Sequence, residues 1–251
     1  MIVYRNKFIR ILECWDDEQP DTENVDLIRQ FQQPRSIDGM FCREFYTILI
    51  DLHQDPDVLL SRINRDTRYE IRRGTRDNFV YELLDGRDAA AFKEFCDFYD
   101  EFAERKNQPK MRRAWLSLLA QADCFRLSRI ADEGGSTMVW HGYHRTHNRV
   151  TLLYSASTWL SGVTSAGRSK LGRANRFQHW QDLLRFRDDH ISVYDFGGWY
   201  EGNTDQKRLQ INKFKEEFGG QIIRNFICER PLTWKGSLFL RIRQSLLGNA
   251  I

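Results

Sequence analysis

The spacing of apolar and polar residues becomes regular after Asn78 and predicts a mixed α+β domain there. Three runs of alternating residues, CFRLSRIAD, STMVWHGYHRT and RVTLLYSAS, are separated by short turns and predict antiparallel hairpins. A strand in NFVYELL and two helices with apolar residues at helical spacing precede them. After them we expect a helix over 173–188, the strand ISVYDF, a helix over 205–218 and the strand QIIRNFICE.

The first 77 residues are less regular and are expected to form an N-terminal extension. Prolines and acidic residues interrupt any period up to about residue 40, so this part reads as a loose arm. A strand over 45–52 follows, and then one helix that begins at Asp55 and Pro56 and carries an arginine-rich run. Residues 78–230 form the expected main domain. Residues 231–251 form an amphipathic segment that docks on it, pairs with a second subunit or lies on an anionic membrane surface.

Composition and charge limit the classes of function. The 251 residues carry 38 basic and 35 acidic side chains, which gives a net charge of +3. This balance does not by itself indicate a protein that binds nucleic acid. No apolar stretch reaches the roughly 18 to 20 residues of a membrane span, and the first residues lack the apolar core of a signal peptide. We therefore expect a cytoplasmic protein whose five cysteines, without metal-ligand spacing, are reduced.

Three segments in order carry a family resemblance: KLGRANRFQHW, YDFGG and FKEEFGG. With the predicted element order, they resemble the GNAT acyltransferase superfamily, in particular its FemAB-like branch, and N-acyltransferases of bacterial surface-polysaccharide biosynthesis. The resemblance covers roughly residues 79–229. It implies a GNAT fold, with a mixed, mostly antiparallel central sheet flanked by helices.

The first segment carries the expected donor site. Free amides at a helix start, together with the helix dipole, can bind a pyrophosphate. In the GNAT family a glycine-containing loop at this place holds coenzyme A, and the resemblance implies acyl-coenzyme A as co-substrate. The alternative is a surface turn with solvated basic residues. The residues expected to bind the cofactor are Arg168, Lys170, Leu171, Gly172, Arg173, Ala174 and Asn175.

Asp195 stands in YDFGG at the end of the fifth strand of the expected fold. In the GNAT arrangement the fourth and fifth strands splay apart, and the acyl group sits in the opening beside this end. Asp195 would share a strand face with Ile191 and Val193, where partial burial suits a carboxylate to take a proton. Alternatively, Asp195 caps a turn by accepting backbone amides across Gly197 and Gly198.

Other side chains near this point are weaker candidates. Tyr154, His141 and Glu201 are further catalytic candidates, because aminolysis needs a base for the amine and an acid for the leaving group. The expected substrate-binding residues are Tyr200, Trp199 and Arg72. No metal site is expected from His141, His144 and His147, because they cannot all share one strand face. In FKEEFGG, Phe214 and Phe218 face inward, the glycines end the helix, and the lysines and glutamates form a solvated face.

The function expected from these features is N-acyl transfer from acyl-coenzyme A to a free or nucleotide-linked amino sugar. We expect no nucleic-acid partner and no membrane-spanning segment, and the chain could form a homodimer. One alternative is a FemAB-type transferase that uses aminoacyl-tRNA. The other is a non-enzymatic nucleic-acid-binding module built on the arginine run over 62–76, which Asp66, Glu70 and Asp77 interrupt.

Overall fold

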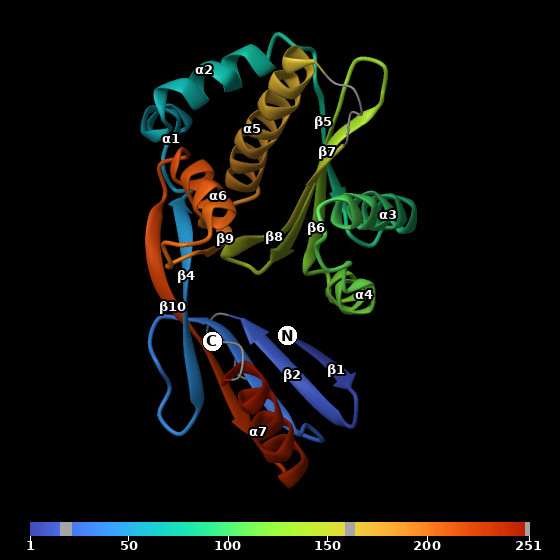
Figure 1. Cartoon of the computed structure of the whole chain (residues 1–251), viewed down its shortest axis with the longest axis vertical. Helices are drawn as coiled ribbons and strands as arrows, with labels where there is room; N and C mark the ends of the chain where they lie inside the picture. Colours follow the sequence, from blue (N-terminus) through green and yellow to red (C-terminus); the bar gives the residue numbers. More distant parts are fainter. Residues whose placement is uncertain (16–21, 159–163, 249–251) are drawn as a thin grey trace. The chain divides into compact units, whose positions relative to one another are not determined.

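The chain divides into two compact units. This computed structural model describes residues 1–15, 22–158 and 164–248 (Figure 1). The smaller unit combines Met1–Tyr46 with Ile223–Ile251, and the larger unit is Thr47–Ile222. Strands β4 (Phe41–Asp51) and β10 (Gln221–Pro231) contribute residues to both. These boundaries differ from the three predicted segments, which are residues 1–77, 78–230 and 231–251.

The smaller unit is a sheet with one helix. Its strands follow the order β1-β2-β3-β10-β4, with β2 and β3 parallel and β10 antiparallel to β3. Ile9, Ile11 and Leu27 form its core together with Leu240 of the helix. The expected loose arm is therefore wrong, because β1 and β2 pair with each other, and β3 pairs with β2 and with β10 from the other end of the chain. The new elements are β1 (Ile2–Asn6), β2 (Ile9–Trp15), β3 (Leu27–Gln33) and α7 (Trp234–Gly248).

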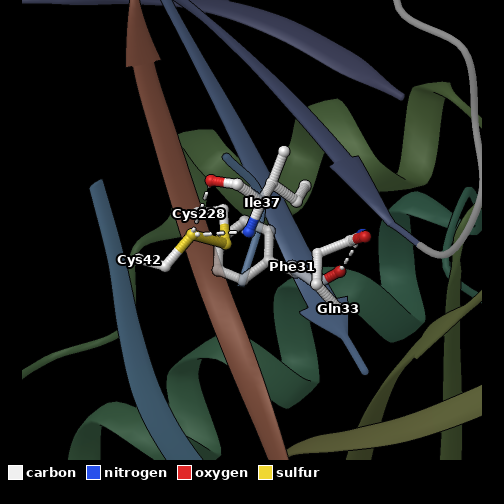
Figure 2. The surroundings of a disulfide bond; sticks show 5 residues. All are labelled: Phe31, Gln33, Ile37, Cys42 and Cys228. Carbon is white, nitrogen blue, oxygen red and sulfur yellow. Dashed lines mark hydrogen bonds between the residues drawn. A yellow bond between two sulfur atoms is a disulfide. The ribbon is translucent and has the colours of Figure 1, made fainter. Parts of the chain in front are cut away.

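A disulfide joins the two long strands within the smaller unit. Cys42 of β4 bonds Cys228 of β10, with a Cα–Cα distance of 4.0 Å. Figure 2 shows Ile37 beside the bridge, where its backbone amide donates to the Sγ atom of Cys42 at 3.3 Å. The expectation that all five cysteines are reduced is therefore wrong. Cys14, Cys96 and Cys124 are not part of a disulfide.

The larger unit follows the predicted order of elements. Its strands are arranged β4-β9-β8-β7-β6-β5, with antiparallel neighbours from β5 to β8 and a parallel β8/β9 pair. Its further elements are α1 (Pro56–Arg62), α2 (Arg65–Gly74), β5 (Val80–Asp85), α3 (Ala89–Arg105), α4 (Arg113–Gln121), β6 (Phe125–Ala131), β7 (Thr137–Arg145), β8 (Arg149–Ser157), α5 (Ser165–Asp188), β9 (Val193–Trp199) and α6 (Gln206–Glu216).

Three details differ from the predicted elements. The described residues contain a sheet of ten strands, which is larger than expected. The sheet is mixed, whereas a mostly antiparallel sheet was predicted. The arginine-rich helix is two helices, because the chain is extended at Ile63 and the Asn64 side chain caps α2 by accepting the amide of Asp66. Helix α5 begins at Ser165 rather than at about Arg173.

Helices cover both faces of the larger unit's sheet (Figure 1). Successive side chains of a strand point to opposite faces, so on β7 Trp140 packs against Phe95 of α3, whereas His141 meets α5. A large core cluster lies on the α5 face, where Tyr143, Tyr194 and Phe186 are fully buried. Gly219, with φ +76, ends α6 in the left-handed conformation, and Phe214 and Phe218 face inward as predicted.

Candidate active site

The parallel strands β8 and β9 diverge in the middle of the larger unit. Their pairing ends at Thr151 and Asp195, although both strands continue beyond these residues. On the other side of β8, the pairing with β7 shifts between Gly142 and Tyr143, so that Leu153 is an extra residue in a bulge. The divergence agrees with the opening between strands that the resemblance implied. We call this region the β8/β9 fork.

Gly197 shapes the β9 side of the fork. Its φ of +70 lies in the left-handed region, and a Cβ atom at this position would stand 2.7 Å from the carbonyl oxygen of Leu152. No other residue type combines this conformation with so close an approach of two backbones. Gly198, the next residue, has nothing within 4 Å of the corresponding position. The first glycine of YDFGG is thus fixed by backbone geometry and the second is not.

The carboxylate of Asp195 is buried and fully bonded at the fork. Its Oδ1 atom accepts from the Gly197 amide at 2.8 Å and from the Thr47 hydroxyl. Its Oδ2 atom accepts from Nη2 of Arg149 at 2.6 Å, from Nε of the same side chain at 3.1 Å and from Thr151 at 3.3 Å. The bond to the Gly197 amide is the turn-capping alternative considered above, here combined with a buried ion pair.

Lys215 of α6 brings a cation to the same turn. Its Nζ atom donates to the carbonyl oxygens of Gly198 at 2.5 Å and Gly197 at 3.3 Å. Burial of this half-buried ammonium lowers its pKa to about 8, although the nearby Asp195 carboxylate acts in the opposite direction. The expectation that the lysine of FKEEFGG is solvated is therefore wrong, because Lys215 is half-buried. The segment contains the signal, a lysine one residue after an inward-facing phenylalanine, but helical periodicity alone places it on the polar side.

His141 belongs to a buried polar network on the other face of the sheet. Its Nδ1 atom lies 2.8 Å from Oδ2 of Asp182, and its Nε2 atom lies 3.0 Å from Oδ1 of Asn175. The Tyr143 hydroxyl donates to the same Asp182 oxygen at 2.6 Å and lies 2.9 Å from the hydroxyl of Tyr194. Burial raises the pKa of both tyrosines well above the usual value. These contacts give His141 a role in fixing α5 on the sheet.

The same network contains the one group of possible metal ligands found among the described residues. Ligand atoms of His141, His179 and Asp182 lie within 4.8 Å of one another, and all three side chains are buried. The Nδ1 atom of His179 lies 2.9 Å from the Tyr194 hydroxyl, and burial lowers the pKa of this imidazole well below 6.5. Hydrogen bonds within the protein therefore already engage all three side chains.

Tyr154 lies away from His141, on the face of β8 that α3 covers. Its ring packs edge-to-face on Tyr99 at 4.8 Å between centroids, and burial raises the pKa of its hydroxyl. It is opposite Gly142 in the sheet and on the same face as Thr151 and Asp195. The structure thus places Tyr154 beside the bulge of the fork and does not bring it together with His141.

The expected pyrophosphate loop is helical. Residues 168–175 all lie inside α5, and the amide of Arg168 already bonds the carbonyl of Thr164 at 3.2 Å. Several of the side chains have other partners: Arg173 binds Asp77 at 2.7 Å, Ala174 is buried, Lys170 stands over the Phe79 ring, and Leu171 packs in the same cluster. Free amides at the start of α5 therefore lie before Arg168, not along the predicted segment.

A pocket of about 700 Å³ lies between α2, α5 and α6. Arg168 and Gly172 line it, so two residues of the expected donor site do face a cavity. Its lining is charged in both senses, and Arg176 bonds Glu217 across it at 3.0 Å. The remaining lining residues are Asn64, Asp66, Thr67, Glu70, Ser165, Ser169 and Lys213.

The predicted substrate-binding residues lie at separate places in the larger unit. Trp199 donates from its indole nitrogen to Glu216 at 3.0 Å, next to Lys215 on α6. The backbone of Tyr200 exchanges two hydrogen bonds with the buried Asn212 side chain, and this pins the end of β9 to α6. Glu201 is exposed in the following loop, and Arg72 is exposed on α2.

Comparison with known structures shows the fold. FemX matches with a TM-score of 0.64 and 13% identity, over 82% of this chain and 72% of that chain. The C-terminal domain of a protein described as a lysylphosphatidylglycerol synthetase, from Agrobacterium fabrum, matches with a TM-score of 0.56 and 11% identity, over 89% and 73%. L-PGS from Bacillus licheniformis matches with a TM-score of 0.52 and 12% identity, over 86% and 72%. No family profile and no curated protein sequence matches the chain.

These comparisons correct the expected function. FemX and a protein described as a lysylphosphatidylglycerol synthetase are among the matching structures, and this finding does not support coenzyme A-dependent acylation of an amino sugar or a part in polysaccharide biosynthesis. They agree better with the alternative of an aminoacyl transferase. No helix in the described part of the chain is long and apolar enough to cross a bilayer. The chain has a GNAT-like fold of the FemAB type.

Proposed function

We propose that this protein is an aminoacyl transferase that takes its aminoacyl group from aminoacyl-tRNA. The proposal is supported by the likeness of the fold to FemX, together with the two structures connected with lysylphosphatidylglycerol synthesis. The observation that carries it is the position of Lys215, a half-buried ammonium at the turn where β9 leaves β8. An ester carbonyl bound in the fork would meet a cation there.

The chemistry required is the attack of a nucleophile on the ester carbonyl of the donor. The bond between the carbonyl carbon and the ribose oxygen breaks and a new bond to the acceptor forms; the acceptor nucleophile loses one proton, and the ribose oxygen takes one up. An ammonium stabilises the negative charge that develops on the carbonyl oxygen. Lys215 has three N–H donors, and two are used on Gly197 and Gly198. With a pKa near 8, it is also a better acid for the leaving oxygen than an ordinary lysine.

Asp195 has a supporting role in this proposal. Its oxygens are occupied by Arg149, Thr47, Thr151 and the Gly197 amide, so the carboxylate holds the fork rather than taking a proton from the acceptor. Its charge also favours the ammonium form of Lys215. Tyr154, on the same face of the sheet, remains a candidate for contact with the acyl group.

Transfer from charged tRNA tests the proposal. Purified protein would be incubated with tRNA carrying tritiated amino acids and with one of two acceptors, a nucleotide-linked peptidoglycan precursor or phosphatidylglycerol vesicles. We expect ribonuclease-resistant label in one arm, and much less with Lys215→Met. Lys207→Met, an exposed position on the same helix, is the matched control. Absence of transfer in both arms, together with no affinity for tRNA, would contradict the proposal.

A further inference from the structure

Helix α2 sorts its residues into a buried and an outward face. Thr67, Ile71 and Gly74 are buried, and a Cβ atom on Gly74 would lie 2.8 Å from Cβ of Phe177 on α5. The backbone of α2 at Gly74 therefore packs directly against the Phe177 side chain of α5, which holds α2 closely on α5. The opposite face is defined by residues at helical spacing that extend just beyond the helix, and we call it the arginine face: Arg65, Arg68, Tyr69, Arg72, Arg73 and Arg76.

The acidic residues that interrupt this run in the sequence are largely separated from it in space. Asp77 turns to the nearly buried guanidinium of Arg173, at 2.7 Å, and Glu70 lies 4.0 Å from the same group and lines the pocket. Asp66 alone stays exposed, where it pairs with Arg65 at 3.4 Å. The interrupted charge pattern of the sequence thus becomes a basic surface in the fold.

Several guanidinium groups on this surface have no acid to bind. Arg72 and Arg76 are exposed, and neither forms an ion pair with any residue that the structure describes. Arg68 donates to the Ser61 carbonyl at 2.6 Å rather than to a carboxylate. A row of arginines without local counterions attracts phosphates, because a guanidinium donates in pairs to phosphate oxygens.

An exposed aromatic ring stands among these arginines. Tyr69 is 59% exposed, and the guanidinium carbon of Arg73 lies 5.7 Å from the centre of its ring. An exposed ring beside a guanidinium plane is the surface on which unpaired bases stack in RNA recognition. A free phosphate or a lipid headgroup would use the arginines but would give Tyr69 nothing to contact.

We propose that the arginine face binds the RNA of the acyl donor, with arginines on backbone phosphates and Tyr69 under an unpaired base. This inference rests on the proposed function, because it names where the tRNA is held. The pocket on the other edge of α2 adds Arg168, Arg176 and Lys213 and leads to α6, the helix that carries Lys215. The acylated end of an RNA bound to the arginine face could therefore pass through this pocket towards the fork.

A binding titration tests the inference. The affinity of the full chain for unacylated total tRNA is measured by fluorescence anisotropy at a range of potassium chloride concentrations. The variant Arg72→Glu/Arg76→Glu should lower the affinity at least about 10-fold and reduce the slope of log K against log salt by about 2. Tyr69→Leu should lower the affinity by about 5-fold or more and leave the slope unchanged. Arg5→Glu/Arg241→Glu changes net charge equally at exposed positions of the smaller unit and should bind like wild type.

The outcomes separate this inference from the proposed function. If Arg72→Glu/Arg76→Glu binds tRNA as tightly as the wild type and the control variant Arg5→Glu/Arg241→Glu do, the arginine face is not the RNA-binding surface. The proposed function then stands. If wild type shows no tRNA affinity, both fail. Equal affinity for tRNA, for duplex DNA of similar length and for heparin would contradict RNA as the ligand. Because charge reversal can disturb folding, Arg72→Gln/Arg76→Gln with an unchanged melting temperature provides the same comparison.

Discussion

Arg149, the first residue of β8, and Asp195, the last residue of β9 that pairs with β8, form a buried ion pair. The guanidinium donates through both Nε and Nη2 to Oδ2 of the carboxylate, at 3.1 and 2.6 Å, and the two side chains are only 10% and 1% exposed. Asp195 lies where the strands separate, so the pair joins them beside this point. A general base would need a free oxygen facing substrate, which this carboxylate lacks.

Replacing Asp195 by asparagine is therefore expected to act on stability. The change leaves the nearly buried Arg149 without its counterion, and breaking a buried pair from one side costs about 3–5 kcal/mol. For a protein of this size that corresponds to a melting temperature lower by roughly 6–20 °C. Thermal unfolding followed by circular dichroism measures it. An unchanged melting temperature with turnover reduced a hundredfold would instead favour the role of base.

The two glycines of the fork give a matched pair of substitutions. Gly197→Ala combines a positive φ with a Cβ atom 2.7 Å from the Leu152 carbonyl, so we expect a loss of about 1–3 kcal/mol of stability and impaired transfer. Gly198→Ala meets nothing within 4 Å and should leave both nearly unchanged. Urea unfolding and the transfer assay compare the two proteins. Equal effects at both positions would show that the close approach of β8 and β9 is not what Gly197 provides.

The disulfide can be tested by counting thiols. Under denaturing conditions the oxidised chain should react at the three cysteines outside the bridge, and at all five after reduction. The bridge spans 186 positions of sequence, and the loss of such a long-range bridge costs about 2–5 kcal/mol. Cys42→Ser should therefore lower the stability of the oxidised protein, while Cys124→Ser, at a partly exposed cysteine outside the bridge, should not. Five reactive thiols before reduction would show that the bridge is not formed.

Sequence periodicity predicts the parts of this fold whose partners are near in sequence. The hairpins of β6, β7 and β8 and the apolar face of α3 all follow from local spacing, and they hold. β1 and β2 are an exception, since they form a hairpin of near neighbours that the predicted loose arm does not contain. β3 pairs with β10 nearly 200 positions away, and the local sequence contains no sign of that partner. The start of α5 was missed for a related reason. Residues 165–172 are small or basic and show no apolar period, so nothing marks them as helical.

The candidate site was predictable only in part. YDFGG lies at the fork, the opening between strands that the resemblance implied, and the bond from the Gly197 amide to Asp195 corresponds to one of the two roles considered for this carboxylate. The sequence did not reveal that Arg149 is the partner of Asp195, since parallel pairing brings together residues 46 positions apart. The helical spacing of the sequence also predicts that Lys215 is exposed to solvent. It cannot show that the carbonyl oxygen of Gly198, on β9, lies close enough to accept a hydrogen bond from Lys215.

Lys215 should set the upper limit of the pH range for transfer. Its ammonium is the active form in the proposed mechanism, and burial lowers its pKa to about 8. Since the charged form is lost as pH rises through this value, kcat/KM should fall above about pH 8, whereas an ordinary lysine would stay charged to about pH 10. Lys215→Arg keeps a cation that does not titrate in this range, so the fall should disappear even if the rate is lower. Rates measured from pH 6 to 10, with Lys207→Arg as the exposed control on the same helix, give the comparison. If Lys215→Arg retains the wild-type decline near pH 8, another group is responsible, and the role of Lys215 as the proton-bearing residue is wrong.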